Sequence, residues 1–248
     1  MPNTNMANRE VCDLIFVDYA TKKPFLNLDF ANVSTTELTS ESVYAYGGKG
    51  HPKRVQFTGE RGGTLTIETQ LQTVKLWEMM TGGTTSRDAA FVKRVEAVVA
   101  ADGIVNLEDT PVAGSVYAYV DGDDCGSDLT CSVAGTTVTL YEDKDKTSAV
   151  AEGTQVILYY RKKVEGSAQR INIKSTSFPK TFTVYGDTVM KTENDEVLPY
   201  KLTAYKAAPQ GNLSLSFSNS GDPGTITITC DLMADSDDNI LDLALIEE

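Results

Sequence analysis

The sequence has little of what most enzymes and metalloproteins need. Its 248 residues include one histidine, His51, and no G-x-S-x-G motif that would place a nucleophilic serine. A catalytic triad also needs a base that a third group orients, so catalysis through His51 is not expected. The four cysteines, at positions 12, 125, 131 and 230, include no C-x₂-C pair with zinc-site spacing. We therefore expect no metal or other cofactor, and reduced cysteines packed as small hydrophobic residues.

Basic residues are also scarce, with 22 Lys and Arg against 35 Asp and Glu, a formal charge of −13. A protein that grips nucleic-acid phosphates needs Lys and Arg, so tight DNA binding is not expected, although DNA that passes without adhering is compatible. No apolar run approaches the roughly 20 residues of a membrane helix. Residues 1–10 show no leader pattern. We expect neither secretion nor a membrane partner.

Alternating polar and apolar residues dominate what is present. Residues 64–68, 213–218 and 225–229 alternate strictly, which predicts strands with one face on a core. One helix is predicted, because Leu71, Val74 and Met80 follow helical spacing and Gly82-Gly83 provides a stop. Segments rich in β-branched and aromatic residues predict further strands at 11–19, 25–30, 42–46, 54–58, 181–189 and 198–205.

The middle of the chain, residues 94–165, is predicted to be a unit of its own. Gly114, Gly135 and Gly153 are each followed by a hydroxyl residue and by a predicted strand with β-branched residues, which favours a meander of short strands. Residues 1–93 and 166–248 would then be two halves of one discontinuous β domain around this insertion, an arrangement that costs little where the ends of the insertion lie close together.

Two acidic segments look like fragments of calcium loops. Residues 235–239 have oxygen ligands at the first, third and fifth positions, but Ile240 and Ile246 replace the loop glycine and the closing glutamate. We therefore predict a turn at residues 121–124 and a helix N-cap at residues 235–239. The apolar tail 239–248 is expected to dock as a short helix or an edge strand, on its own domain or on a neighbour.

A glycine-lysine loop spans residues 47–52. It lacks the G-x-x-x-x-G-K-[ST] pattern of a phosphate-binding loop, and a strand rather than a helix follows it, so we expect a glycine loop that can order against a neighbouring subunit. Over residues 1–92, 93–165 and 166–248 the formal charges are −1, −6 and −6. A basic surface on one subunit could meet an acidic surface on the next, and a solvated mixed surface is the alternative. The basic residues of the first quarter include Lys22, Lys23, Lys49, Lys53, Arg54 and Arg61.

The series from residue 56 to residue 83 resembles the tail tube proteins of tailed bacteriophages. Gln56-Phe57-Thr58-Gly59-Glu60 is followed by the alternating residues 62–70, by the helix carrying Leu76-Trp77-Glu78-Met79-Met80, and by Gly82-Gly83. The upstream segment resembles the long inter-ring loop of that family. By this resemblance the candidate inter-subunit residues are Tyr44, Tyr46, Gly47, Gly48, Lys49 and His51.

The resemblance implies a mainly β protein, a β-sandwich or barrel of tail-tube type with one short helix, plus an inserted small β domain on the outside of a tube. It implies a virion structural protein of the viral tail rather than an enzyme, assembled in the host cytoplasm. Self-assembly into homo-hexameric rings, stacked head-to-tail, would make a conduit through which DNA is ejected without specific binding. Sheath, tape measure or baseplate proteins would be further partners.

Two other readings stay open. The first is a different β-rich phage surface module, such as a capsid decoration, a baseplate or fibre component, or a carbohydrate-binding sandwich. Such a module would be a monomer or trimer with a patch that uses Tyr44, Tyr46, Tyr117 or Tyr119. The second is a hydrolase with a carboxylate pair, although no motif selects two particular residues.

Overall fold

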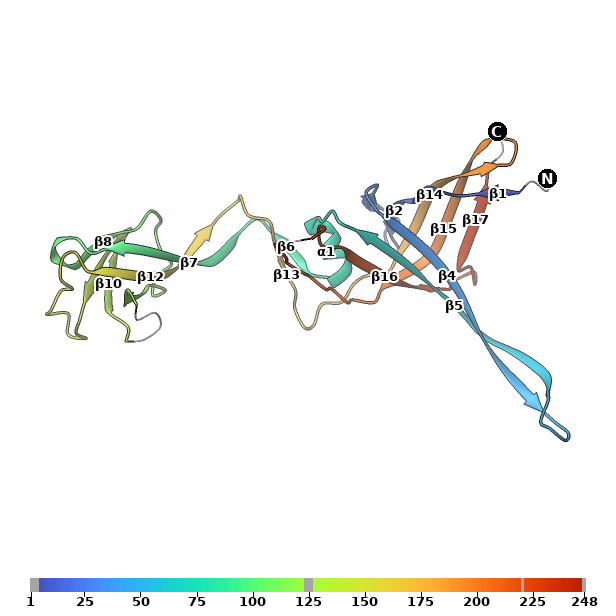
Figure 1. The fold of residues 1–248 in the computed structure, drawn as a ribbon, viewed down its shortest axis with the longest axis horizontal. Coiled ribbons are helices and arrows are strands. Elements are labelled where there is room, and N and C mark those ends of the chain that lie inside the picture. The colour runs from blue at the N-terminus through green and yellow to red at the C-terminus, as the bar shows by residue number, and fades with distance from the viewer. Residues whose placement is uncertain (1–4, 123–126, 220, 247–248) are drawn as a thin grey trace. The chain divides into compact units, whose positions relative to one another are not determined.

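The computed structural model describes residues 5–122, 127–219 and 221–246, and it divides the chain into two compact units. Met1–Thr85 and Ile171–Glu248 form the first, here called the core unit, and Ser86–Arg170 form the second, the insert unit. The fold is mainly β, with 54% strand and 5% helix, which confirms the predicted fold class (Figure 1). The predicted insertion at 94–165 lies within the insert unit.

The core unit contains one antiparallel sheet of nine strands. Its order is β3-β2-β14-β15-β16-β5-β4, with β1 added to β14 and β17 added to β15. The described part of the sheet is open, since β3 and β4 each pair on one side only, and no barrel closes within one chain. The strands are β1 (Met6–Ala7), β2 (Asp13–Asp18), β3 (Pro24–Leu28), β4 (Val33–Tyr46), β5 (Lys53–Thr69), β14 (Phe182–Thr192), β15 (Val197–Pro209), β16 (Ile226–Met233) and β17 (Leu241–Leu245).

The sheet encloses a single hydrophobic core. Phe16 of β2 and Phe182 of β14 meet edge to face with ring centroids 5.2 Å apart, and Leu65 and Ile67 of β5 belong to the same cluster. The backbone N–H of Cys12 donates to the Ser34 hydroxyl of β4 at 3.1 Å. The curl of the sheet therefore brings the chain before β2 against β4, and both halves of the sheet share one core.

The one α-helix among the described residues, α1 (Val74–Thr81), packs on this core through Leu76, Met79 and Met80. Its start is set by the Thr73 hydroxyl, which accepts a hydrogen bond from the Leu76 backbone N–H at 3.1 Å. It ends at Gly82, whose φ is +67° and where a Cβ would lie 2.2 Å from the Phe178 carbonyl oxygen. The predicted helix and its glycine stop are confirmed.

Two predictions for the second half of the core unit are wrong. Residues 213–218 alternate as a strand would, yet they have no regular secondary structure. Residues 235–239 form a turn instead of a helix N-cap, because the strand β17 follows them. The Asp235 carboxylate accepts the backbone N–H groups of Asp237 and Asn239, both at 2.9 Å, and these bonds lower its pKa. The C-terminal tail adds to β15 of its own unit, as one of the two alternatives allowed.

The insert unit consists of two three-stranded sheets, β7-β12-β9 and β10-β11-β8, around a core of its own. Gly114, Gly135 and Gly153 all have positive φ and lie in the turns before β9, β11 and β12, so the predicted turns between short strands are present. The predicted meander is wrong, because among the described strands of this unit only β10 and β11 pair as consecutive strands, whereas β12 pairs with β7 and β9. Gly122 also lies in a turn, whereas Asp123 and Asp124 are outside the described residues. The elements are β7 (Ala89–Val98), the short 3₁₀ turn η1 (Ala101–Gly103), β8 (Ile104–Asn106), β9 (Tyr117–Val120), β10 (Thr130–Ala134), β11 (Thr137–Tyr141) and β12 (Gln155–Val164).

The two chain segments that join the units pair with each other. They are β6 (Thr84–Ser86) and β13 (Arg170–Asn172), which form a separate two-stranded sheet. The insertion therefore begins and ends at neighbouring points of the chain, the condition under which an inserted domain costs little.

The cysteines pack as hydrophobic residues where they are described. Cys12 and Cys230 are buried in the core of the core unit, and burial raises the thiol pKa to about 11 and about 12. Burial likewise raises the pKa of Cys131, in the insert unit, to about 11, and Cys125 lies outside the described residues. Across the described segments, no helix has the length and apolar character needed to span a membrane.

Candidate assembly surfaces

The distal halves of β4 and β5 form a two-stranded arm. We define the arm as residues 41–60. Residues 62–69 of β5 are alternately half-buried and buried, whereas residues 53–61 of the same strand are exposed on both faces. Figure 1 shows the paired strands running out beyond the rest of the core unit. At about 3.3 Å per residue, the paired part extends roughly 20 Å.

An irregularity in the ladder marks where the arm begins. Ser40 pairs with Arg61 and Ser42 pairs with Thr58, so two residues of β5 lie opposite one residue of β4. Such a bulge bends a ribbon and increases its twist. Close approach continues at Gly63, where a Cβ would lie 2.5 Å from the Glu37 carbonyl oxygen. The arm therefore leaves the body of the sheet next to a glycine that the close packing of the two strands requires.

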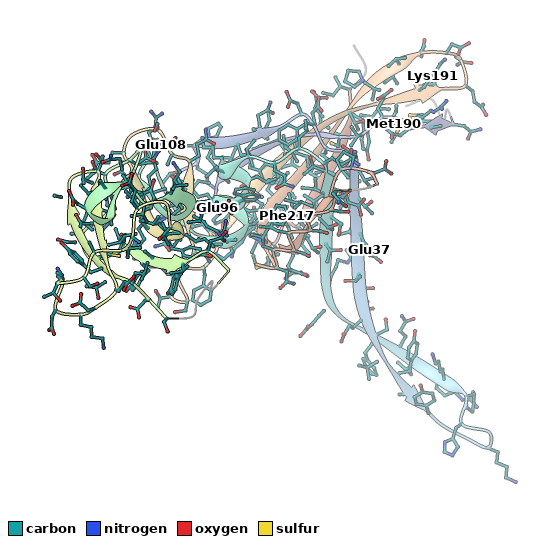
Figure 2. All side chains as sticks on the ribbon, turned by 60° about the vertical axis from the view of Figure 1, so that its left-hand side comes forward. Glu37, Glu96, Glu108, Met190, Lys191 and Phe217 are labelled. Carbon is teal, nitrogen blue, oxygen red and sulfur yellow. The ribbon has the colours of Figure 1, made fainter. Side chains whose placement is uncertain are left out.

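The two faces of the arm differ. Val43 lies opposite Phe57 and Ala45 opposite Val55, which places all four on one face. Val43 is 67% exposed and Phe57 is 60% exposed. The opposite face is polar, and there the Gln56 amide donates to the Ser42 hydroxyl at 2.9 Å. The side chains beyond Glu37 stand clear of the rest of the core unit (Figure 2). An apolar face of this kind on an isolated ribbon indicates a binding surface.

The predicted inter-subunit residues all lie at the tip of this arm. The turn is closed by the Gly47 N–H, which donates to the Pro52 carbonyl at 3.3 Å. Arg54 donates from Nε to the Gly47 carbonyl at 3.2 Å, and the Lys53 ammonium lies 3.8 Å from the Tyr44 ring centroid. Tyr44 and Tyr46 are on β4, and Gly47, Gly48, Lys49 and His51 are in the turn, with positive φ at Gly48 and His51.

A second surface, which sequence reasoning did not find, lies on the outer side of β4, β5 and β16. The strand registers place nine residues on one face in three rows. These rows are Val33–Glu68–Thr227, Thr35–Thr66–Thr229 and Glu37–Thr64–Asp231. We call these nine residues the hydroxyl–carboxylate face. The neighbouring residues of β5 and β16, such as Leu65 and Ile228, point the other way into the core.

The chemistry of this face is uniform. It presents five threonine hydroxyls and three carboxylates, with no Lys or Arg among its nine residues. At its margin, the Gln210 amide donates to the Asp231 carboxylate at 2.9 Å. A hydrated, negatively charged surface repels phosphate. The alternation of residues 64–68 and 225–229 does predict two of the three strands. Residues 33–37 were not predicted as a strand, and no local sequence pattern indicates that three distant segments pair.

The outer edge of β4 is a third candidate surface. β4 pairs with β5 alone within the described residues, so its other edge carries unpaired backbone N–H and C=O groups. Natural proteins usually protect such edges with Lys or Pro, and residues 33–46 contain neither. A long edge without this protection is suited to pairing with a strand of another chain.

The tyrosines of the alternative reading do not share one sheet. Tyr44 and Tyr46 belong to the arm of the core unit, whereas Tyr117 and Tyr119 lie on β9 of the insert unit. Among the residues that the structure describes, no group of three or more His, Cys, Asp or Glu side chains is placed to hold a metal ion.

Comparison with known families gives one match, which covers both units. Residues 9–246 match the YomU/Tube protein family. No curated protein matches the chain.

Proposed function

Since the chain belongs to the YomU/Tube protein family, we propose that it is the subunit of a bacteriophage tail tube, which forms stacked hexameric rings around a DNA conduit. The match confirms the resemblance of this sequence to tail tube proteins. It supports a structural component of the virion tail rather than an enzyme. Assembly in the host cytoplasm, and contacts with sheath, tape measure or baseplate proteins, belong to this proposal.

The arm is the observation that carries the proposal. Its face of Val43, Ala45, Val55 and Phe57 is exposed in the single chain, and exposing this much apolar surface on a ribbon without a partner is unfavourable. In a stack of rings, the arm would bury this face on a neighbouring subunit. Its basic tip, with Lys49, Lys53 and Arg54, would then approach the acidic surface that the other subunits offer.

Ring closure would use the free sheet edges. A heterologous contact, in which a different surface of each neighbour is used, generates a closed ring when the rotation is right. The unpaired outer edge of β4 supports this, because pairing it with a segment of a neighbouring subunit would remove an edge that otherwise promotes aggregation.

The hydroxyl–carboxylate face is proposed to line the lumen. A conduit must let DNA slide, so its wall should be hydrated and should offer no basic group that phosphates can bind. The absence of Lys and Arg from this nine-residue face fits that requirement. The insert unit, which has a core of its own, is proposed to decorate the outside of the tube.

Assembly of the purified chain tests the proposal. Sedimentation velocity and negative-stain microscopy over a range of concentrations are expected to show six-fold rings or hollow tubes. Val43→Asp places a charge on the apolar face of the arm and should abolish them. Val197→Asp is the matched control, because Val197 is similarly exposed on β15 outside the arm. Strictly monomeric particles at every concentration would refute the tube.

The lumen assignment has a test of its own. Thr66→Cys and Thr229→Cys each place a thiol in the middle row of the hydroxyl–carboxylate face. In tubes, a small maleimide should label these thiols while a maleimide on a polymer wider than the lumen should not, and both reagents should label the monomer. The parent chain sets the background from its own cysteines. Equal labelling of tubes by both reagents would place this face outside.

A further inference from the structure

Residues 213–218, between β15 and β16, have the sequence pattern of a strand but no regular secondary structure. Residues 207–221 contain no Asp, Glu, Lys or Arg and are the longest uncharged stretch in the chain. Within it, residues 213–218 alternate Leu, Ser, Leu, Ser, Phe, Ser, a pattern typical of a strand with one apolar face. Phe217, labelled in Figure 2, is nevertheless 91% exposed.

The local geometry explains why this segment does not pair with β16. The β15–β16 ladder ends where Pro209 lies opposite Cys230, followed by one bond from the Gln210 N–H to the Thr229 carbonyl at 2.9 Å. Gly211 then takes a φ of +73°, a left-handed conformation that turns the chain away. Where the ladder would continue, a groove of about 560 Å³ separates residues 211–214 from Thr225, Thr227 and Thr229.

We propose that residues 213–218 become a β-strand only on assembly, by pairing with the free outer edge of β4 in a second copy of the chain. This inference rests on the proposed function and adds the segment that joins one subunit to the next. Each subunit would give one strand and receive one. The contact is therefore heterologous, the type that closes a ring.

Charge argues for a second copy as the partner. Two chains that each carry −13 repel, so a homotypic contact is favoured where the contacting segments are neutral. Residues 207–221 are neutral, and the acceptor segment of β4, residues 33–40, carries a single charge, at Glu37. Strand addition to an edge needs no charged side chain, because main-chain hydrogen bonds provide the affinity.

The length and the side-chain pattern of residues 213–218 also fit pairing with β4. Six residues in extended form span about 20 Å, which fits within the roughly 26 Å of residues 33–40, the part of β4 that lies on the body of the sheet. Leu213 already packs against the core, so the donor segment is held at its start. Leu215 and Phe217 follow on the same face of an extended strand, and pairing would allow both to be buried at the joint between subunits.

Hydrogen exchange read by mass spectrometry tests this directly. In the monomer, amides of residues 213–217 should exchange fast, since these residues have no regular secondary structure. In tubes or rings, their exchange should slow by about 100-fold or more, together with the amides of residues 33–40. Protection of 213–218 already in the monomer would show pairing within one chain and would overturn the inference. Protection of 213–218 in tubes without any change at 33–40 would overturn the assignment to β4.

Paired variants separate a strand from a simple apolar contact. Ser216→Pro removes a backbone N–H and should block assembly, whereas Ser216→Thr at the same position favours a strand and should preserve it. Phe217→Asp should weaken assembly more than Phe178→Asp, an equal change at a phenylalanine that is 76% exposed outside the segment. Normal tubes from Ser216→Pro would refute the strand while leaving the tube function intact. A chain that never assembles would refute both.

Discussion

The two units of the chain differ in how complete they are. The described part of the insert unit folds six strands into two sheets around a core, and ion pairs tie the loop after β8 to β7 and β12. The core unit has a larger sheet but leaves an exposed arm, a free strand edge on β4 and residues 213–218 without regular secondary structure. The longest exposed surface, the arm, thus lies in the core unit, while the insert unit leaves shorter strand edges unpaired and exposes apolar residues such as Val92. This contrast supports the proposal that the core unit is the part that assembles.

The ion pairs of the insert unit centre on Asp109. Its carboxylate binds the Lys162 ammonium at 2.6 Å and the Lys93 ammonium at 3.0 Å, and it accepts the Tyr160 hydroxyl at 3.3 Å. Lys93 also reaches Glu108 at 2.8 Å. The acidic loop is therefore fixed onto two neighbouring strands, β7 and β12, with no group from outside the unit.

The largest expected effect comes from removing the arm. Ser40 and Arg61 are a registered pair, so residues 41–60 can be replaced by Asn-Gly, which favours a two-residue hairpin turn. The core unit should keep its fold, while the concentration needed for assembly should rise by about 100-fold or more. Fluorescence of Trp77, the only tryptophan in the chain, reports the fold, and sedimentation reports assembly. Unchanged assembly would remove the arm from the interface.

The second prediction compares the two halves of β5. Leu65 is 1% exposed in the core, and Leu65→Ala should lower the free energy of unfolding by about 2–5 kcal/mol. Val55, on the arm, is 50% exposed, and Val55→Ala should change it by less than about 0.5 kcal/mol in the monomer. Urea unfolding followed by Trp77 fluorescence measures both. A comparable loss from the two variants would mean that the arm packs on its own unit.

The same contrast shows what could be predicted from the sequence. Strands with one buried face, such as residues 64–68 and 225–229, were predictable because burial on a core imposes alternation. The helix was predictable because Leu76 and Met80 pack on the core at helical spacing and the left-handed Gly82 ends it. Residues 213–218 alternate equally well, yet the prediction of a strand was wrong for the single chain. Alternation indicates that one face is buried, but it does not indicate whether the same chain or a neighbour covers that face.

Surfaces assembled from distant segments could not be predicted. The hydroxyl–carboxylate face takes Glu37, Thr66 and Asp231 from three strands far apart in sequence, and only the register brings them into one plane. Residues 33–40 were missed as a strand because they are mostly polar Ser and Thr and lie at an exposed edge. The arm tip was predicted as an inter-subunit loop from its resemblance to a family, and its role stays a prediction.

The third prediction concerns acid stability of the insert unit. The Lys162 and Lys93 ammonium groups lower the pKa of Asp109 to about 2, from an ordinary value of 3.8. A lowered carboxyl pKa contributes stability that is present above about pH 4 and is lost as the pH falls toward about 2. Asp109→Asn should flatten this dependence, as measured by hydrogen exchange at β12. Asp145→Asn, an exposed carboxylate in the same unit, should leave it unchanged. An equal effect of both variants on the pH dependence would show that the ion pairs of Asp109 do not stabilise the insert unit.

The smallest expected effect lies within the arm. The Lys53 ammonium stacks over the half-buried Tyr44 ring, an interaction of about 0.5–1 kcal/mol near the surface. Lys53→Met should therefore speed hydrogen exchange at the arm tip of the monomer by roughly two- to fivefold, and Lys53→Arg should not, because guanidinium also stacks on aromatic rings. Lys49→Met, in the adjoining turn, is the control for loss of charge. In tubes the difference between Lys53→Met and the parent should disappear, because a neighbouring subunit would then hold the arm. A difference that persists in tubes would mean that the arm is as free there as in the single chain.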